Sequence, residues 1–423
     1  MRYRSLFNTA LGLSLLCLAL AVVPKAFARV GDDAVVLPKG YSRLFFDAEF
    51  YIPFEKRYDS NGNVEALGAD FNTNLNSSVF PALAGFGPGA TLGQSVVSYK
   101  RYLQQYLLQP AYGLTDRLTI GANIPYVSIK NDIGASLDTS GATVGKSPFS
   151  PFPSMLAPCS APGCATGGPI PGTTPLTTND VQNLLASQGF KPIKTWENSG
   201  FGDVEVGGRY QYYRSEFFRS AFTGGVRFPT GYADDPNNLV DTAWGGGTYA
   251  LLFRFNQDFM YQKEGLGKRL GFPDPWTGFI NTTFSYDWNL PNSQTMHVCS
   301  PRAPVCANQG KVDRKLGDML QAEISGKLGV FFPGLIFSPV YIYGYKFKDS
   351  YSGDQNLPYG NLAIDTSQTQ NIYILTLTYT SIPAFVQKQF PFPFFASVSY
   401  RDRFAGTNAV KSQFVGFTLA GFF

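Results

Sequence analysis

Apolar and polar residues alternate along much of this sequence with a period of two. Between positions 202 and 212, Val204, Val206 and Tyr210 stand at even positions, whereas the odd positions are mostly charged or polar. Alternation of this kind puts the two classes on opposite faces of a β-strand, but on an α-helix it would spread charge around the whole surface. The pattern recurs at 44–52, 278–289, 320–330 and 394–403. It predicts strands with one face in an apolar environment and the other in water.

The alternating segments, with a few more weakly patterned ones, predict about twelve strands. They lie near 43–53, 97–112, 118–130, 200–213, 221–231, 248–261, 278–290, 318–332, 335–348, 371–382, 394–404 and 413–423. Each is long enough for a tilted strand to cross a membrane, which takes roughly 9–11 residues.

The connections between these segments alternate in length. Turns such as 113–117 and 333–334 are short, whereas the loops at 54–92, 131–199, 292–314 and 350–368 are long. Short turns at one end and long loops at the other are typical of outer-membrane barrels. The sequence therefore predicts an all-β fold, a transmembrane antiparallel β-barrel of about twelve strands, with both termini in the periplasm and every long loop extracellular.

Composition narrows the function classes. Of the 423 residues 15% are charged and 15% aromatic, and the mean hydropathy is −0.08. Soluble domains average about 25% charged residues, and polytopic helical membrane proteins contain several apolar runs of about 20 residues. Both classes are disfavoured. A single histidine, His297, leaves little of the usual equipment for acid–base or metal chemistry. We therefore expect no enzyme activity, no cofactor and no metal site.

The first 28 residues have the three parts of a secretory signal peptide. Arg2 and Arg4 form a basic start, positions 11–23 are an apolar run, and Ala26 and Ala28 supply the small residues before a cleavage site. Cleavage after Ala28 leaves 29–423, which we expect to form one outer-membrane barrel domain with 131–199 as a large extracellular insertion. The mature chain is close to neutral, so nothing favours nucleic acid as a partner.

Four cysteines remain after signal cleavage, in two close pairs. Cys159 stands near Cys164, and Cys299 near Cys306. An exported chain meets oxidising conditions, so two local disulfides are expected. A bridge between the two loops and a four-thiolate metal site are the alternatives, although the spacings are wider than those of common zinc pairs.

The end of the chain resembles the C-terminal insertion signal of bacterial outer-membrane proteins. Phe417, Leu419 and the terminal Phe423 share one face of the last segment. This resemblance implies recognition by the barrel-assembly machinery, followed by contact with outer-membrane lipid and lipopolysaccharide. The alternative is the buried final strand of a soluble β-protein.

Alternation also assigns a set of charged residues to the barrel interior. The expected lumen-lining residues are Arg43, Asp47, Glu49, Arg101, Asp203, Glu205, Arg209, Arg227, Arg254, Asp258, Asp287, Glu323, Lys327, Arg401 and Arg403. The signs are mixed, so we expect many of them to pair across neighbouring strands. No ring of one sign indicates ion selectivity. A polar lumen implies a pore or a plugged pore.

The loop at 131–199 is too long to be a simple connection. Asn179 or Asp180 is expected to cap a short helix that runs through Val181 and Leu185 and ends near Gly189. Such a loop could fold inward and narrow the pore, shield its mouth, or be an external decoration. For His297, in another long loop, we expect a structural or solvent-exposed role.

Several short motifs resemble the outer-membrane family named for the meta-pathway of phenol degradation. They are the stretches 111–118 (AYGLTDRL), 124–126 (IPY), 200–204 (GFGDV), 208–210 (GRY) and 226–231 (VRFPTG). The resemblance covers roughly 97–259. It implies a barrel associated with transport of aromatic or other hydrophobic compounds.

These observations favour an outer-membrane channel for passive uptake of small hydrophobic or aromatic molecules. A general diffusion porin is one alternative, although about twelve strands make a narrower lumen than the 16–18 of porins. A barrel hydrolase and a structural or adhesion barrel sealed by its loops are the others.

Overall fold

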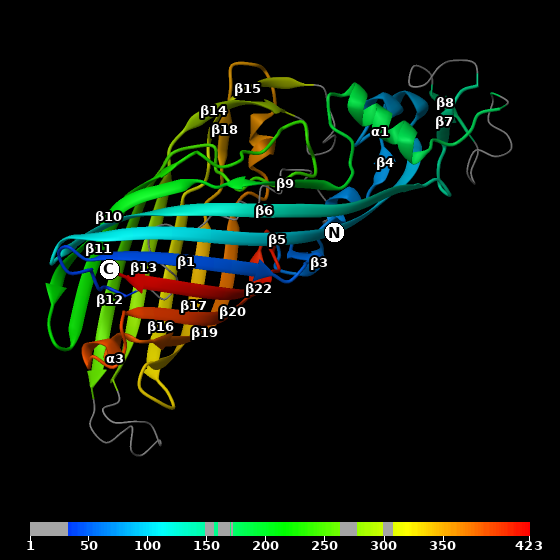
Figure 1. The fold of residues 1–423 in the computed structure, drawn as a ribbon. Coiled ribbons are helices and arrows are strands. Elements are labelled where there is room, and N and C mark those ends of the chain that lie inside the picture. The colour runs from blue at the N-terminus through cyan, green and yellow to red at the C-terminus, as the bar shows by residue number, and fades with distance from the viewer. Residues whose placement is uncertain (1–32, 149–155, 160–169, 171, 263–276, 299–307) are drawn as a thin grey trace, which may run out of the picture.

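Twelve antiparallel strands close into a barrel in the computed structural model, which describes residues 33–148, 156–159, 170, 172–262, 277–298 and 308–423 (Figure 1). In order around the wall they are β1 (Ser42–Tyr51), β5 (Thr91–Thr115), β6 (Leu118–Asp138), β10 (Val204–Arg214), β11 (Phe218–Phe228), β12 (Ala250–Gln262), β13 (Thr277–Asn289), β16 (Met319–Gly329), β17 (Leu335–Lys346), β19 (Gln368–Thr380), β20 (Phe394–Thr407) and β22 (Gln413–Phe422). The last strand pairs with the first, with Ala48 opposite Phe417. The barrel therefore has no free edge, and the predicted fold class and strand count are confirmed.

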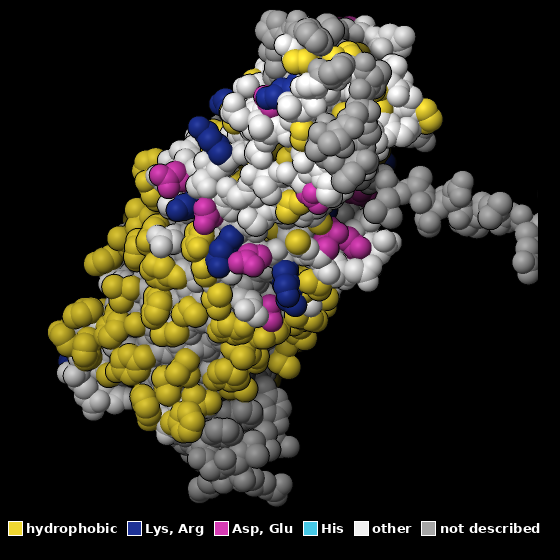
Figure 2. Space-filling model, turned by 90° about the vertical axis from the view of Figure 1, so that its right-hand side faces the viewer, with side chains coloured by type: hydrophobic (Ala, Val, Ile, Leu, Met, Phe, Trp, Pro, Cys, Tyr) yellow, Lys and Arg dark blue, Asp and Glu magenta, His cyan; other side chains and the backbone are white. Residues whose placement is uncertain are grey.

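The outer wall is apolar, which is the reverse of a soluble protein. Phe255, Phe284 and Leu419 are 43%, 45% and 57% exposed. Figure 2 shows a broad hydrophobic surface on the barrel wall, with charged side chains gathered beyond it. Phe417 and Phe423 of the expected insertion signal also lie on this surface, 50% and 74% exposed. Among the described residues, no helix is both long enough and apolar enough to span a membrane.

Two strands are longer than predicted. β5 has 25 residues and β6 has 21, whereas the expected strands begin at Val97 and end at Lys130. Residues 94–98 and 134–138 pair with one another, and β6 also pairs with β9 (Trp196–Phe201). The two strands project beyond the rest of the barrel (Figure 1). The predicted strands ended where the alternation of apolar and polar residues ended. The hydrogen-bonded pairing of β5 with β6 continues beyond that point.

The two ends of the barrel differ. At the turn end, β5 is joined to β6, β10 to β11 and β16 to β17 by short connections. The opposite end, the loop end, carries folded connections. The expectation that every long connection lies at the loop end is wrong for the one between β12 and β13, because β12 ends and β13 begins at the turn end. Strand direction, not loop length, decides the end at which a connection lies.

The loops at the loop end form small folded units. One contains β4 (Asn74–Asn76), η2 (Pro81–Phe86), β7 (Val144–Lys146), β8 (Leu156–Pro158) and α1 (Thr178–Ser187), which lie beside the loop end in Figure 1. Its buried core includes Leu83, Leu92, Val144 and Leu185. The others are β2 (Lys56–Tyr58) with β3 (Val64–Ala66), η1 (Ala69–Phe71) and β21 (Ala409–Val410), and β14 (Asn292–His297) with β15 (Gln309–Lys315), β18 (Ser350–Ser352) and η3 (Tyr359–Ala363). A short helix, α3 (Ile382–Val386), lies at the turn end.

The predicted helix in 131–199 is present, but its N-cap was assigned wrongly. Thr177 is the N-cap, and its hydroxyl accepts a hydrogen bond from the Asp180 backbone N–H (3.2 Å). The Asp180 carboxylate in turn accepts one from the Thr177 N–H (2.8 Å). This reciprocal arrangement is a capping box, so Asp180 occupies the third helical position and not the cap. Gly189 follows the helix with φ +88°, as expected for a residue just beyond a helix C-terminus.

Candidate functional site: the barrel lumen

A buried ion-pair network crosses one wall of the barrel interior. The Arg227 guanidinium on β11 contacts Glu205 Oε1 on β10 and Asp287 Oδ2 on β13, both at 2.8 Å. Glu205 also accepts a hydrogen bond from Asn123 Nδ2 on β6 (3.2 Å) and is fully buried. The structure thus brings together three of the residues that alternation placed in the lumen. The network connects neighbouring strands in the way that mixed charges predicted.

The segment before β1 lies inside the turn end of the lumen. The Ala34 N–H donates to both carboxylate oxygens of Asp258 on β12 (3.1 and 3.0 Å). Lys327 on β16 forms an ion pair with Asp33 (2.9 Å), and the Leu37 N–H donates to Thr119 on β6 (2.7 Å). Because these partners belong to separated strands of the wall, the segment from Asp33 to Leu37 spans the lumen. We name it the N-terminal segment.

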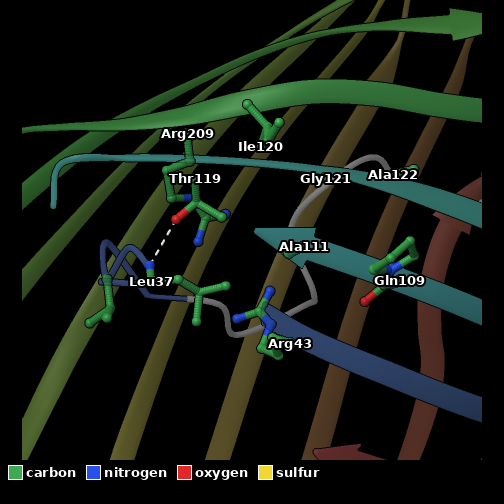
Figure 3. Close-up of a pocket in the computed structure, with 11 residues that line it drawn as sticks. Leu37, Arg43, Gln109, Ala111, Thr119, Ile120, Gly121, Ala122 and Arg209 are labelled. Carbon is green, nitrogen blue, oxygen red and sulfur yellow. Dashed lines mark hydrogen bonds between the residues drawn. The ribbon is translucent and has the colours of Figure 1, made fainter. Parts of the chain in front are cut away.

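A small pocket lies beside the N-terminal segment. Figure 3 shows Leu37 and its hydrogen bond to Thr119, with Arg43, Gln109 and Arg209 around the same pocket. The cavity measures about 30 Å³, which holds only one or two water molecules. Arg209 Nη1 also donates to the Asp33 carbonyl (2.9 Å). Part of the predicted lumen set therefore binds this segment, an arrangement that the sequence analysis missed.

A second segment closes the loop end. The connection between β11 and β12, residues 229–249, buries Val240 and Trp244 against Leu103, Val127 and Ile129 of β5 and β6. Those three side chains alternate with outward-facing ones, so they belong to the inner face of the wall. We name residues 229–249 the mouth loop. In the described part of 131–199, α1 and its core lie beside the loop end, whereas the mouth loop packs against the inner face of the wall.

Hydrogen bonds hold the mouth loop in place. Asn131 Nδ2 donates to the Val240 carbonyl (2.7 Å) and to Thr242 Oγ1 (2.9 Å). The Asp203 carboxylate accepts from the backbone N–H groups of Gly231 (2.9 Å) and Gly246 (2.7 Å). Asp203, predicted to line the lumen, therefore fixes both ends of the mouth loop. Backbone bonds of this kind depend on tertiary structure and leave no pattern in the sequence.

The mouth loop is expected to respond to pH through Asp241. This carboxylate accepts hydrogen bonds from the Tyr232 hydroxyl (2.7 Å) and the Asp235 N–H (3.0 Å). Burial, with the charge of Asp234 nearby, raises the pKa of Asp241 to about 7. A raised carboxyl pKa means that stability is greatest below the unfolded value of about 3.9 and falls as the pH rises toward 7. The Asp241→Asn variant should lose this dependence. The measurement is hydrogen exchange of the backbone amides of 229–249, corrected for intrinsic rates. In the wild type the opening equilibrium constant should increase by up to about tenfold per pH unit between roughly pH 5 and 7. An equal slope in both proteins would contradict the assignment.

The remaining predicted lumen residues have varied surroundings. Arg101 donates to Asn131 Oδ1 (2.8 Å) and the Tyr99 hydroxyl (2.6 Å), and the Arg43 guanidinium lies 4.1 Å from the Phe45 ring centroid. Glu49 accepts from the Tyr51 hydroxyl (3.3 Å), Asp47 accepts from Thr418, and Arg254 and Glu323 are buried. Arg401 and Arg403 lie on β20 and are half-buried. Arg219, which the prediction omitted because it started that strand at Ala221, forms an ion pair with Asp258 (3.2 Å).

His297 joins three loops at the loop end. Its ring stacks on Phe190 with centroids 4.1 Å apart, and its Nε2 lies 2.9 Å from Asn237 Oδ1 and 2.8 Å from Gln309 Nε2. The ring is 8% exposed. Of the two roles expected for His297, structural or solvent-exposed, this packing favours the structural one.

Of the four cysteines expected to form disulfides, the structure describes Cys159 alone. Cys164, Cys299 and Cys306 lie outside the described residues, whereas Cys159 is almost buried in the unit that contains α1. The pairing stays a prediction. The described residues hold no group of three or more His, Cys, Asp or Glu side chains arranged to bind a metal ion.

Comparison with known proteins places the fold. No family model matches the sequence, and no curated protein matches it. Among solved structures, the COG4313 outer membrane channel from Pseudomonas putida F1 has a TM-score of 0.51 and 12% identity, covering 94% of this chain and 100% of that one. A FadL homologue from Pseudomonas aeruginosa covers 90% of each chain with 10% identity, at a TM-score of only 0.30. The first likeness shows a shared fold: this chain forms a β-barrel closed by twelve antiparallel strands, and that barrel resembles the fold of the outer membrane channel.

Proposed function

We propose that this protein is an outer-membrane channel for passive uptake of small hydrophobic or aromatic molecules. The observation that carries the proposal is a closed barrel with an apolar outside and a polar interior. Among the described residues, the N-terminal segment and the mouth loop occupy this interior, and neither is a strand of the wall. Such segments are held by hydrogen bonds and local packing, so they can move without opening the wall. The solved structure with the same fold is described as an outer membrane channel. The motifs between 97 and 259 support the hydrophobic or aromatic substrate class.

The route of the protein to the membrane belongs to the same proposal. Cleavage after Ala28 would leave residues 29–32 ahead of the N-terminal segment in the mature chain. Phe417, Leu419 and Phe423 then serve recognition by the barrel-assembly machinery. Once inserted, the turn end faces the periplasm and the loop end faces lipopolysaccharide and the medium. A pair of disulfides, Cys159 with Cys164 and Cys299 with Cys306, would stabilise two of the exposed loops.

Flux through proteoliposomes tests this proposal. Swelling with small neutral solutes and entry of an aromatic probe should both exceed those of protein-free vesicles. A deletion strain should grow more slowly than the parent on at least some aromatic carbon sources. No flux for the intact protein and none after removal of the N-terminal segment would instead support a sealed structural barrel. Rapid flux of polar solutes without any preference for aromatic ones would support a general porin.

A further inference from the structure

Two arginines lie side by side on the inner face of β20 without carboxylate partners. Arg401 and Arg403 are two residues apart in the strand, so their side chains leave the same face roughly 6–7 Å apart. Arg401 Nη1 donates to the Tyr51 hydroxyl (3.4 Å), and Arg403 Nη1 donates to the Val410 carbonyl (2.7 Å). The Nε atom of each is buried and has no hydrogen-bond partner. Neither guanidinium forms an ion pair within the described part of the chain.

The opposite wall shows that this arrangement is not general to the lumen. There Arg227 has two carboxylates at 2.8 Å. Near β20, the carboxylate of Glu49 accepts the Tyr51 hydroxyl (3.3 Å), and Asp402 accepts the Tyr373 hydroxyl (3.3 Å) on the outer face. Neighbouring like charges are unfavourable, and buried charges are normally paired. An anion between the two guanidinium groups would remove both costs.

Apolar side chains border the arginine pair on both sides. On β19, Ile374 lies opposite Arg401 and Ile372 lies opposite Arg403. On β17, Val340 and Ile342 continue this row, and the four aliphatic side chains form one buried cluster. On the other side, Phe414 of β22 lies opposite Arg401, whose guanidinium is 5.3 Å from the ring centroid. The cationic strip therefore lies between an aliphatic patch and an aromatic ring.

The position of this strip suits an entering molecule. Tyr51 ends β1 and Phe414 follows the first residue of β22, so both lie in the half of the barrel nearest the loop end. The N-terminal segment binds Thr119, Asp258 and Lys327 nearer the turn end. A molecule that passes the mouth loop reaches the arginines before it meets the N-terminal segment.

The geometry points to a binding site for small amphipathic carboxylates, which we name the arginine site: Arg401 and Arg403 with Ile372, Ile374 and Phe414. The inference rests on the proposed channel function and narrows its substrates from hydrophobic molecules in general to hydrophobic monocarboxylic acids. A guanidinium presents a planar fork of N–H donors that matches a carboxylate, and two of them can share its oxygens. The apolar body of the ligand then packs along the patch or against the ring. These apolar side chains are buried, so the flexible arginine side chains must turn aside to admit it.

Binding of octanoate and octanamide to the full mature barrel in detergent tests this inference by calorimetry. The two probes share an apolar tail and differ in charge. We expect octanoate to bind at least about tenfold more tightly than octanamide, and acetate, which lacks the tail, to bind weakly. The Arg401→Gln/Arg403→Gln double variant should lose the preference for octanoate. The control is Arg117→Gln/Arg214→Gln, which removes two exposed arginines at the turn end and should bind octanoate as the wild type does.

The outcomes separate this inference from the channel function. Equal binding of octanoate and octanamide to the wild type would overturn the arginine site, and this comparison needs no variant to fold. Unchanged octanoate binding in a folded double variant, judged by the heat-dependent gel shift of barrels, would overturn it too. Suppose that neutral aromatic probes enter proteoliposomes faster than protein-free vesicles, whereas carboxylates enter both at the same rate. The channel function would then stand, but hydrophobic carboxylates would be refuted as its substrates. Absence of flux both through the intact protein and through the form without the N-terminal segment would refute the channel itself.

Discussion

Removal of residues 29–38 from the mature protein should raise its single-channel conductance several-fold. The N-terminal segment spans the lumen between β6 and β16, where it is hydrogen-bonded to Thr119 and ion-paired with Lys327, and a pocket beside it measures about 30 Å³. The strands themselves need not change, because the deletion stops before Lys39, and Gly40 and Tyr41 retain their backbone hydrogen bonds with Gly113. Current through single channels in planar bilayers measures the effect.

A point variant separates release of the N-terminal segment from its loss. Asp33→Asn removes the ion pair with Lys327, so the N-terminal segment should leave its position more often. Brief openings of high conductance should become more frequent, whereas the current between openings should equal that of the wild type. Glu216→Gln, an exposed carboxylate at the same end, is the matched control and should behave as wild type. If the shortened protein conducts no better than the intact one, the N-terminal segment is not what limits the lumen.

Replacement of Arg227 by Gln should destabilise the barrel by about 3–5 kcal/mol, the cost of leaving buried charges without their partner. Glu205 is fully buried, and Arg227 is its ion-pair partner, as it is for Asp287. Guanidinium titration of the barrel in detergent, followed by tryptophan fluorescence and the gel shift, measures the change in unfolding free energy.

Neutralising the whole network should restore most of that loss. In Arg227→Met/Glu205→Gln/Asp287→Asn no buried charge lacks a partner, so the variant should be much closer to wild type than Arg227→Gln is. Arg214→Gln, at an exposed position, should change stability by less than about 0.5 kcal/mol. If Arg227→Gln is as stable as the wild type, water in the lumen already screens the charges of Glu205 and Asp287, and the expected loss of stability is refuted.

The wall of the barrel could be predicted because its signal is local. Each strand has its own period of two, and each side chain meets lipid or the interior according to parity alone. For this reason Val206, Phe417 and Leu419 could be assigned to the apolar face, and Glu205, Arg227 and Asp287 to the inside, without knowledge of the neighbouring strands. Beyond Lys130 the alternation of apolar and polar residues no longer follows the barrel pattern, although the strand continues. The predicted end of this strand was therefore misplaced.

The contents of the barrel could not be predicted in this way. Leu37 is held by Thr119, and Asp33 by Lys327 at a separation of 294 residues. The mouth loop depends on Asp203 and Asn131, which bind mostly its backbone and therefore select no residue type. Neither segment alternates, and neither carries a motif for insertion into a lumen.

The same division applies to charge. Alternation by itself determined that Arg401 and Arg403 point inward, as it did for Arg227. Only the closed barrel decided that Arg227 meets two carboxylates whereas the β20 pair meets isoleucines and a phenylalanine. The physical reason is that a residue's facing direction follows from its own strand, whereas its partners come from strands that register and closure bring alongside. Sequence alone thus determined a twelve-stranded wall with a polar inside, and tertiary structure decided what fills that inside and which of its charges remain available.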